Sequence, residues 1–343
     1  MSGSGLEAIS LIQNQSNSTK LILRPRDNDV DYVQLAIIIP GSLQLVLCAF
    51  ASLAIIRVRA LRVGQNIYVV NMVLSDILRG ILGLWIFAFG LSSYGYNSRA
   101  GSNACVSFFF FWHWQFFWST WGTVLISRSR YRTIKDPLAD GVTTRKAAFA
   151  STATCLMGIV IAVPPLFTWA RYKMSTFVDP NGYYSHYCVV DQSNHTNYLS
   201  FLLFYYGISY WLPFVFVIYY LGQTLRIVFR SIAERRRLTG LASGASDTEA
   251  NRSTPLFKSK ALWYVIILVA SNAIFPAPYI ITQLLRSTIR ISADIVIATG
   301  LVFRINFLVN SVLYCFWAKT LTSSLWNVVR CRKLRNVPVI RQK

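Results

Sequence analysis

The chain has 343 residues, 54% of them hydrophobic and 14% charged, with a formal net charge of +21. The mean hydropathy of +0.43 favours a protein with several membrane spans over the two soluble domains that this length would allow. The positive charge alone would suit a nucleic-acid-binding protein, but its distribution, described below, excludes nucleic acid as a partner. The six cysteines form no CxxC pair and no His lies at metal-ligand spacing, so the sequence predicts no zinc or other metal-ligand cluster of this kind.

Residues 1–34 form a polar N-terminal tail whose apolar runs are short and interrupted by acids. This composition is not that of a signal peptide, so we expect the first spanning helix to direct its own insertion. Glycosylation sequons begin at Asn14 and Asn17, and another begins at Asn194. Because such sites are used only outside the cell, they favour an extracellular N-terminus.

Seven apolar segments follow the tail, each long enough for a helix to cross a bilayer core of about 30 Å. They lie at residues 33–56, 67–93, 104–127, 147–169, 199–225, 261–284 and 293–316. Short polar loops connect them, except for a longer segment at 226–260 whose composition predicts a flexible loop. We therefore predict an all-α membrane protein, with a seven-transmembrane helix bundle over 35–317, followed over 318–343 by a short amphipathic eighth helix and a basic tail.

The basic residues decide the orientation, because loops rich in Lys and Arg stay in the cytoplasm. Of the 34 Lys and Arg residues, 24 lie on one side of the predicted membrane. They occur in residues 57–65, 128–146, 226–260 and 317–343. An extracellular N-terminus places all of these segments in the cytoplasm, where they face anionic lipid and cytosolic partners.

Sequence motifs occur in order on these segments. They are Asn66-Ile-Tyr-Val-Val-Asn71-Met-Val-Leu-Ser-Asp76, then Cys105 at 25 residues before Arg130, then Ser129-Arg130-Tyr131 followed by Pro137-Leu138, and Asn306-Phe-Leu-Val-Asn310-Ser311-Val-Leu-Tyr314. Together they resemble the rhodopsin-like class of G-protein-coupled receptors over about residues 35–330. The resemblance implies a plasma-membrane receptor for an extracellular ligand that acts on heterotrimeric G proteins, with arrestin as a further partner, no cofactor and no enzymatic activity.

The chain departs from the family pattern at several positions. Ser129 replaces the acid that normally restrains the neighbouring arginine, and Ser311 replaces a proline. Ile274 stands two residues before Pro276, where the family usually has a tryptophan, and the first segment lacks its usual asparagine. These departures concern the activation mechanism of the family rather than its fold.

The resemblance implies roles for residues near both membrane faces. Arg130, Tyr131 and Tyr314 would carry coupling to the G protein, although a basic residue at a cytoplasmic helix end also satisfies the orientation rule. Cys105 and Cys188 would form a disulfide on the oxidising outer side, the alternative being two free thiols. Cys331, beside the basic end of the chain, either carries palmitate or is unmodified.

Charged residues inside the membrane are costly and are therefore candidates for function. In the family, the aspartate matching Asp76 binds sodium, and here Ser119, Asn306 and Asn310 would complete that polar network. Arg79 lies three residues after Asp76 on the same helix, so it can pair with the carboxylate instead.

Arg304 lies six residues before Asn310, where opsins carry the lysine that binds retinal. Its guanidinium stays protonated and forms no Schiff base, so the alternatives are an anionic ligand held by Arg304 or a structural role for this cation. Trp112 lies 18 residues before Arg130, where amine receptors carry an aspartate, which argues against an amine ligand. We predict a pocket lined by Trp112, Gln115, Phe116 and Arg304, for an anionic, lipid or peptide ligand.

A seven-span anion transporter or channel is the alternative function, since two intramembrane arginines could conduct anions. The chain has no internal repeat and no inverted pair of broken helices, which are typical of transporters. An enzyme is disfavoured because the sequence has no nucleophile–base pair, no zinc-ligand set and no phosphate-binding loop.

Overall fold

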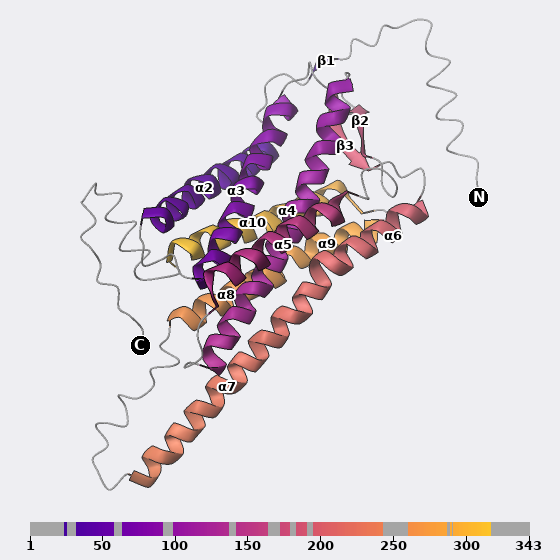
Figure 1. The fold of residues 1–343 in the computed structure, drawn as a ribbon. Coiled ribbons are helices and arrows are strands. Elements are labelled where there is room, and N and C mark those ends of the chain that lie inside the picture. Colours follow the sequence, from indigo (N-terminus) through magenta and orange to yellow (C-terminus); the bar gives the residue numbers. More distant parts are fainter. Residues whose placement is uncertain are drawn as a thin grey trace, which may run out of the picture.

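The computed structural model of the chain describes residues 24–25, 32–57, 64–91, 99–136, 142–163, 172–178, 183–190, 195–242, 260–286, 289 and 291–316. Within them, helices lie on all seven predicted segments (Figure 1). They are α2 (Tyr32–Arg57), α3 (Gly64–Leu91), α4 (Arg99–Lys135), α5 (Thr144–Ala162), α6 (His195–Tyr206) joined through the π-helix η3 (Gly207–Trp211) to α7 (Leu212–Ala242), α8 (Lys260–Ile274) followed by α9 (Pro276–Arg286), and α10 (Ala293–Phe316). The predicted seven-helix fold is confirmed. The predicted eighth helix and tail at 318–343 lie outside the described residues.

Several of these helices can cross a membrane by length and composition alone. In the described part of the chain the qualifying stretches are Asn66–Leu84, Thr144–Ala162, Leu199–Ser231 and Ile266–Arg286, with shorter apolar helices at Ile39–Leu53 and Ala298–Leu313. Large apolar side chains are also exposed on the outside of the bundle, among them Phe149 at 77% and Val215 at 61%. Such a surface is expected where helices face lipid rather than water.

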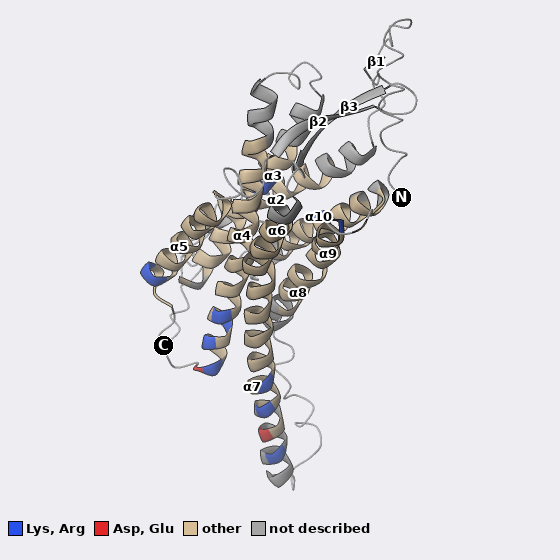
Figure 2. Ribbon diagram, turned by 90° about the vertical axis from the view of Figure 1, so that its right-hand side faces the viewer, with Lys and Arg blue, Asp and Glu red and all other residues tan. Residues whose placement is uncertain are grey.

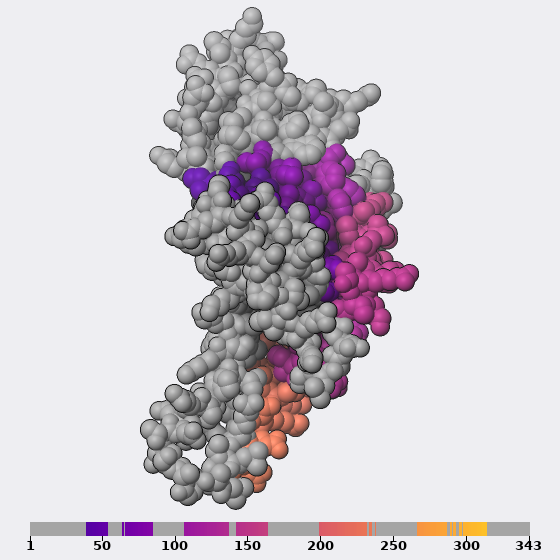
Figure 3. Space-filling view, turned by 60° about the vertical axis from the view of Figure 1, so that its left-hand side comes forward, coloured from indigo at the N-terminus to yellow at the C-terminus, as the bar shows by residue number. Residues whose placement is uncertain are grey.

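The helix α4 runs through the middle of the bundle and contacts α3, α5, α7 and α8 (Figure 1). Buried apolar residues form one cluster around Met72 and Leu268 and a second, aromatic one around Phe116 and Phe303. On the side seen in Figure 3, the described residues of α2 to α5, coloured indigo to magenta, form one continuous surface. The central helix α4 therefore contacts helices from both the N-terminal part of the chain, α3 and α5, and the C-terminal part, α7 and α8.

The helix α7 is longer than predicted. We expected the fifth segment to end at residue 225 and a flexible loop to follow, but α7 continues to Ala242. The prediction was wrong here because residues 226–242 contain mainly good helix formers, including Leu, Ala, Glu and Arg, and their polarity alone does not end a helix. The basic end of α7 thus extends as a helix beyond the apolar part of the bundle (Figure 2).

A small sheet, which we did not predict, lies between α5 and α6. Strands β2 (Tyr172–Val178) and β3 (Tyr183–Val190) form an antiparallel hairpin, and β1 (Arg24–Pro25) pairs with β3 in parallel. Aromatic and β-branched residues, which favour strands, are frequent in the hairpin. Because β2 contacts α4, the hairpin lies at the end of the bundle where α4 begins (Figure 1).

Two helices are interrupted inside the bundle. Proline has no backbone N–H and is favoured at the first position of a helix, so the break between α8 and α9 falls at Phe275, just before Pro276. In the π-helix η3, the carbonyl oxygen of Ile208 accepts a hydrogen bond of 3.2 Å from Nε1 of Trp121. The Tyr210 hydroxyl donates to the carbonyl oxygen of Ala273 at 2.5 Å, which joins η3 to α8 near its break.

A close backbone approach at Gly64 leads to a prediction about stability. A Cβ atom added at Gly64, in the first turn of α3, would overlap the carbonyl oxygen and carbon of Val142. We expect Gly64→Ala to lower the free energy of unfolding by about 1–3 kcal/mol, because the backbone must move. At Gly83, where a Cβ meets nothing within 4 Å, alanine should instead stabilise the helix by about 0.5–1 kcal/mol.

Thermal unfolding of the two purified variants in detergent tests this pair. Relative to the unmodified chain, the midpoint should fall for Gly64→Ala and rise for Gly83→Ala. Equal midpoints for Gly64→Ala and Gly83→Ala would contradict the close approach between α3 and Val142.

Candidate functional site

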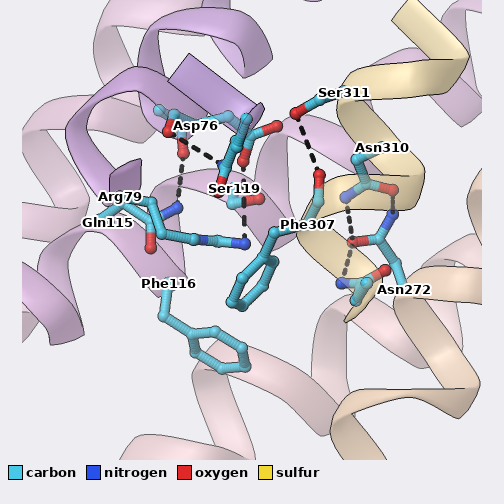
Figure 4. A network of polar contacts seen from close by, with 12 residues as sticks. Asp76, Arg79, Gln115, Phe116, Ser119, Asn272, Phe307, Asn310 and Ser311 are labelled. Carbon is cyan, nitrogen blue, oxygen red and sulfur yellow. Dashed lines mark hydrogen bonds and ion pairs between the residues drawn. The ribbon is translucent and has the colours of Figure 1, made fainter. Parts of the chain in front are cut away.

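A buried polar core lies where α2, α3, α4 and α10 meet (Figure 4). Asp76 and Arg79, on successive turns of α3, form an ion pair in which Oδ1 and Nη1 are 3.7 Å apart. Their side chains are 0% and 4% exposed. The guanidinium carbon of Arg79 lies 3.4 Å from the centre of the Phe307 ring on α10, the geometry of a cation–π contact. Arg79 therefore joins α3 to α10.

Amide side chains from α2 and α4 border this ion pair. Nε2 of Gln44 donates to the backbone carbonyl oxygen of Asp76 at 3.0 Å, and Nε2 of Gln115 donates to Oγ of Ser75 at 2.9 Å. Ser119, one turn beyond Gln115, is also buried. Gln115, which we predicted to line a ligand pocket, is thus bonded to α3 in the polar core.

Three asparagines form a second part of the core, between α8 and α10 (Figure 4). Oδ1 of Asn272 accepts 3.2 Å hydrogen bonds from Nδ2 of both Asn306 and Asn310. Oδ1 of Asn310 in turn accepts 3.2 Å bonds from Nδ2 of Asn272 and Oγ of Ser271. Asn306 and Asn310, which we predicted to complete a sodium network with Asp76 and Ser119, are therefore bonded to α8 through Asn272.

Trp112 and Phe116, two of the predicted pocket residues, share one aromatic partner. The ring centre of Phe303 on α10 lies 5.7 Å from that of Trp112 and 5.6 Å from that of Phe116. Phe303 also stacks on Tyr279 of α9 at 5.1 Å. These rings join α4, α9 and α10 into one aromatic cluster, which contains no acidic group.

Arg304 follows Phe303 on α10 and is partly buried. Its guanidinium lies close enough to Tyr279 for an electrostatic interaction. Arg304 is thus beside the aromatic cluster that contains Trp112 and Phe116, whereas Gln115 points into the polar core. Three of the four predicted pocket residues are close together.

The described residues also form a small pocket between α4, η3, α7 and α8. It is lined by Thr120, Tyr210, Pro213 and Asn272, with five further residues of these helices. None of the four residues predicted to bind ligand lines it. This pocket reaches the asparagine cluster from the α7 side of the bundle.

The opposite end of α4 carries the predicted coupling residues. The ring of Tyr131 lies 5.8 Å from that of Tyr220 on α7, and Nζ of Lys135 lies 5.9 Å from the Tyr131 ring. Ser129 is 5% exposed, and its hydroxyl has no hydrogen-bond partner among the described residues. Figure 2 shows described Lys and Arg residues gathered at this end, where α4 and α7 end and α5 begins.

Other predicted site residues lie outside the described part of the structure, wholly or in their side chains. These are Asn14, Asn17, Asn194 and Cys331, and the side chains of Cys105, Cys188 and Tyr314. In the backbone, Cys105 lies in α4, and Cys188 lies in β3 opposite Met174.

Sequence reasoning missed Gln44, Asn272 and Phe307. The two amides each stand in an apolar segment, which is the signal that could have identified them, because a buried amide needs a hydrogen-bond partner. Phe307 gives no such signal, since nothing in the sequence distinguishes its ring from the other aromatic side chains of the bundle.

Comparison with known proteins agrees with the seven-helix fold. Residues 49–314 match the profile of the family described as 7 transmembrane receptor (rhodopsin family). The blue-sensitive opsin of Gallus gallus is 25% identical over 228 residues, covering 65% of this chain and 57% of the opsin. The ultraviolet-sensitive opsin of Melopsittacus undulatus is 22% identical over 281 residues, covering 80% of this chain and 75% of the opsin. The crystal structure of squid rhodopsin superposes with a TM-score of 0.66 at 15% identity, covering 89% of this chain and 87% of squid rhodopsin.

Proposed function

Because this chain belongs to the rhodopsin family of seven-transmembrane receptors, we propose that it transmits an extracellular, non-aminergic signal to a heterotrimeric G protein across the plasma membrane. The observation that carries the proposal is the basic end of α4. There the end of α4, which carries Arg130 and Tyr131, lies on the same side of the bundle as the Lys and Arg residues of α7 and α5 (Figure 2). Tyr131 contacts Tyr220 of α7, so a movement of α7 would displace the ring of Tyr131, one of the proposed coupling residues.

The proposed orientation places this basic end in the cytoplasm and the hairpin of β2 and β3 outside the cell. The distribution of Lys and Arg along the chain supports it, as do the sequons in the N-terminal tail. Outside the cell, a Cys105–Cys188 disulfide would tether β3 to the start of α4. In the cytoplasm, palmitate on Cys331 would hold the end of the chain at the membrane.

Activation is proposed to be a shift between two populations of the bundle. A ligand that binds one population more tightly stabilises it by that difference in affinity. The interruption at Phe275 divides α8 from α9, and α9 carries Tyr279 in the aromatic cluster. A change of packing around Phe303 would therefore move α9 through Tyr279, and α9 is connected at Phe275 to α8, which leads to the cytoplasmic surface.

The ligand is proposed to be an anion, or a lipid or peptide with an anionic group, held by Arg304. The aromatic cluster beside Arg304 supplies apolar surface, and its described members carry no carboxylate for an amine. The relatives named opsins raise the question of retinal. The guanidinium of Arg304 does not fit a retinal Schiff base, because it stays protonated.

Substitution of Arg304 tests the class of ligand. Against an anionic agonist, Arg304→Ala is expected to raise the half-maximal concentration about 10- to 100-fold, the loss that one charge-assisted hydrogen bond predicts. Arg304→Lys should lose less, because it keeps the charge. Arg286→Ala removes an exposed arginine at the end of α9 that also interacts electrostatically with Tyr279, so it is the control for charge alone and should change the concentration less than Arg304→Ala does.

The measurement is G-protein nucleotide exchange in membranes, with a library of carboxylate, phosphate, lipid and peptide compounds. An anionic agonist that activates the unmodified receptor and Arg304→Ala equally would contradict the role of Arg304. Absence of exchange on every G-protein class, with or without ligand, would contradict coupling itself. Anion flux into proteoliposomes that is lost in Arg304→Ala would instead favour a transporter or channel.

Arrestin is the further cytosolic partner that we propose. Its binding would depend on phosphorylation of hydroxyl side chains in two cytoplasmic segments outside the described residues. The candidates are Ser243, Ser246, Thr248, Ser253, Thr254, Thr320, Thr322, Ser323 and Ser324. Phosphate on these segments would also weaken the attraction of the neighbouring basic residues to anionic lipid.

A further inference from the structure

We infer that Arg79 is a built-in counter-ion for Asp76, so that the core of this receptor takes no sodium ion. Resemblance to the family left two alternatives for Asp76: sodium, with Ser119, Asn306 and Asn310 as further ligands, or pairing with Arg79. Whether these residues fit sodium can be decided from the contacts that they make.

The carboxylate of Asp76 already has a cation beside it. Nη1 of Arg79 is 3.7 Å from Oδ1, and both side chains are almost completely buried. A sodium ion at the carboxylate would lie within a few ångströms of the guanidinium. At about 4 Å in a protein interior, repulsion between two like charges would weaken sodium binding by roughly a thousandfold.

Of the two amide oxygens expected to bind sodium, that of Asn310 is already bonded. Oδ1 of Asn310 accepts two hydrogen bonds, from Ser271 and Asn272. Oδ1 of Asn306 has no hydrogen-bond partner among the described residues, so it remains one available oxygen. Hard cations take several oxygen ligands, and one neutral amide oxygen does not replace a carboxylate that is already paired.

Phe307 holds Arg79 in this position. Its ring lies under the guanidinium at 3.4 Å, so the planar cation is positioned by α10 as well as by Asp76 (Figure 4). This ring packs against the planar guanidinium and would not be a ligand for a sodium ion. Since Arg79 spans from α3 to α10, it provides the link between helices that a bound ion would otherwise provide.

Thermal unfolding of the purified full-length receptor in sodium chloride and in N-methyl-D-glucamine chloride, at equal ionic strength, tests this inference. The midpoint of the unmodified receptor should be the same in both salts. In Arg79→Met the carboxylate loses its cation, and we expect sodium to raise the midpoint by about 3 °C or more. In the double variant Asp76→Asn, Arg79→Met, the sodium effect should disappear.

A saturable, sodium-specific rise in the midpoint of the unmodified receptor overturns the inference, and this result needs no variant. A folded Arg79→Met that shows no response to sodium also overturns it. If Arg79→Met does not fold, Phe307→Leu is the second variant. It removes the ring contact of the Arg79 guanidinium, so we expect a sodium response that is smaller than that expected for Arg79→Met, and no response would contradict the inference. The readout does not involve a G protein, so its failure is distinguishable from failure of the proposed function.

Discussion

Replacing Asn272 with alanine is expected to lower the free energy of unfolding by about 3 kcal/mol, because buried amide groups are left without partners. Nδ2 of Asn306 and Nδ2 of Asn310 both donate to Oδ1 of Asn272. Asn272 itself donates to Asn310 and, at 2.8 Å, to the backbone carbonyl oxygen of Leu268. Asn306 and Asn310 are 2% and 0% exposed, so bulk solvent does not reach the groups that lose these bonds.

Thermal or denaturant-induced unfolding of purified protein measures this effect. Ser271→Ala is the matched control, one residue away on α8. It removes one bond to Asn310, whose Oδ1 keeps the bond from Asn272, so we expect a loss of about 1 kcal/mol. The double variant Asn272→Ala, Asn310→Ala should lose less than the sum of the two single variants, because the two residues share their bonds. Strict additivity would show that the two amides do not act together.

The seven helices could be predicted from the sequence because the signals for them are local. An apolar run such as 199–225 needs only its own length and composition to predict a span. The pairing of Asp76 with Arg79 could be expected for the same reason, since residues three apart on a helix share a face. The structure contains that ion pair at 3.7 Å.

The partners of these residues on other helices could not be predicted. Gln115 and Phe116 are neighbours on α4, yet Gln115 bonds to Ser75 whereas Phe116 packs on Phe303. Which of them faces a ligand pocket depends on the rotation of α4 about its axis. That rotation is set by packing against all the surrounding helices, which a single sequence with no alignment does not specify.

The errors at helix ends have a related cause. Polar composition after residue 225 predicted a loop, because inside a membrane protein polarity usually marks the end of a span. Beyond the membrane, however, a helix needs only residues of good helix propensity, and α7 continues to Ala242. The hairpin of β2 and β3 was missed because its strands pair residues that are 6 apart near the turn, at Val178 and Tyr184, and 18 apart at Tyr172 and Val190, and no local pattern determines that register.

Arg130→Ala is expected to reduce the rate of G-protein nucleotide exchange about 100-fold, the effect of losing one charged contact of roughly 3 kcal/mol. Arg130 lies in the last turns of α4, next to Tyr131, whose ring contacts Tyr220 of α7. Exchange in membranes, normalised to the amount of receptor at the cell surface, measures the change. Arg130→Lys keeps the charge but not the planar group, so it should retain part of the activity.

Arg132 offers a control that separates coupling from orientation, because it is an exposed basic residue of the same helix end. If Arg130 acted only as one more positive charge on the cytoplasmic side, Arg132→Ala would reduce exchange as much as Arg130→Ala. We expect Arg132→Ala to lose less than threefold, since one exposed charge contributes about 0.5 kcal/mol.

Ser129→Asp tests the residue beside Arg130. It places a carboxylate at a buried position where the serine hydroxyl has no hydrogen-bond partner among the described residues. An acid there should pair with Arg130 and lower basal exchange, whereas unchanged basal exchange would show that Ser129 does not set the basal activity.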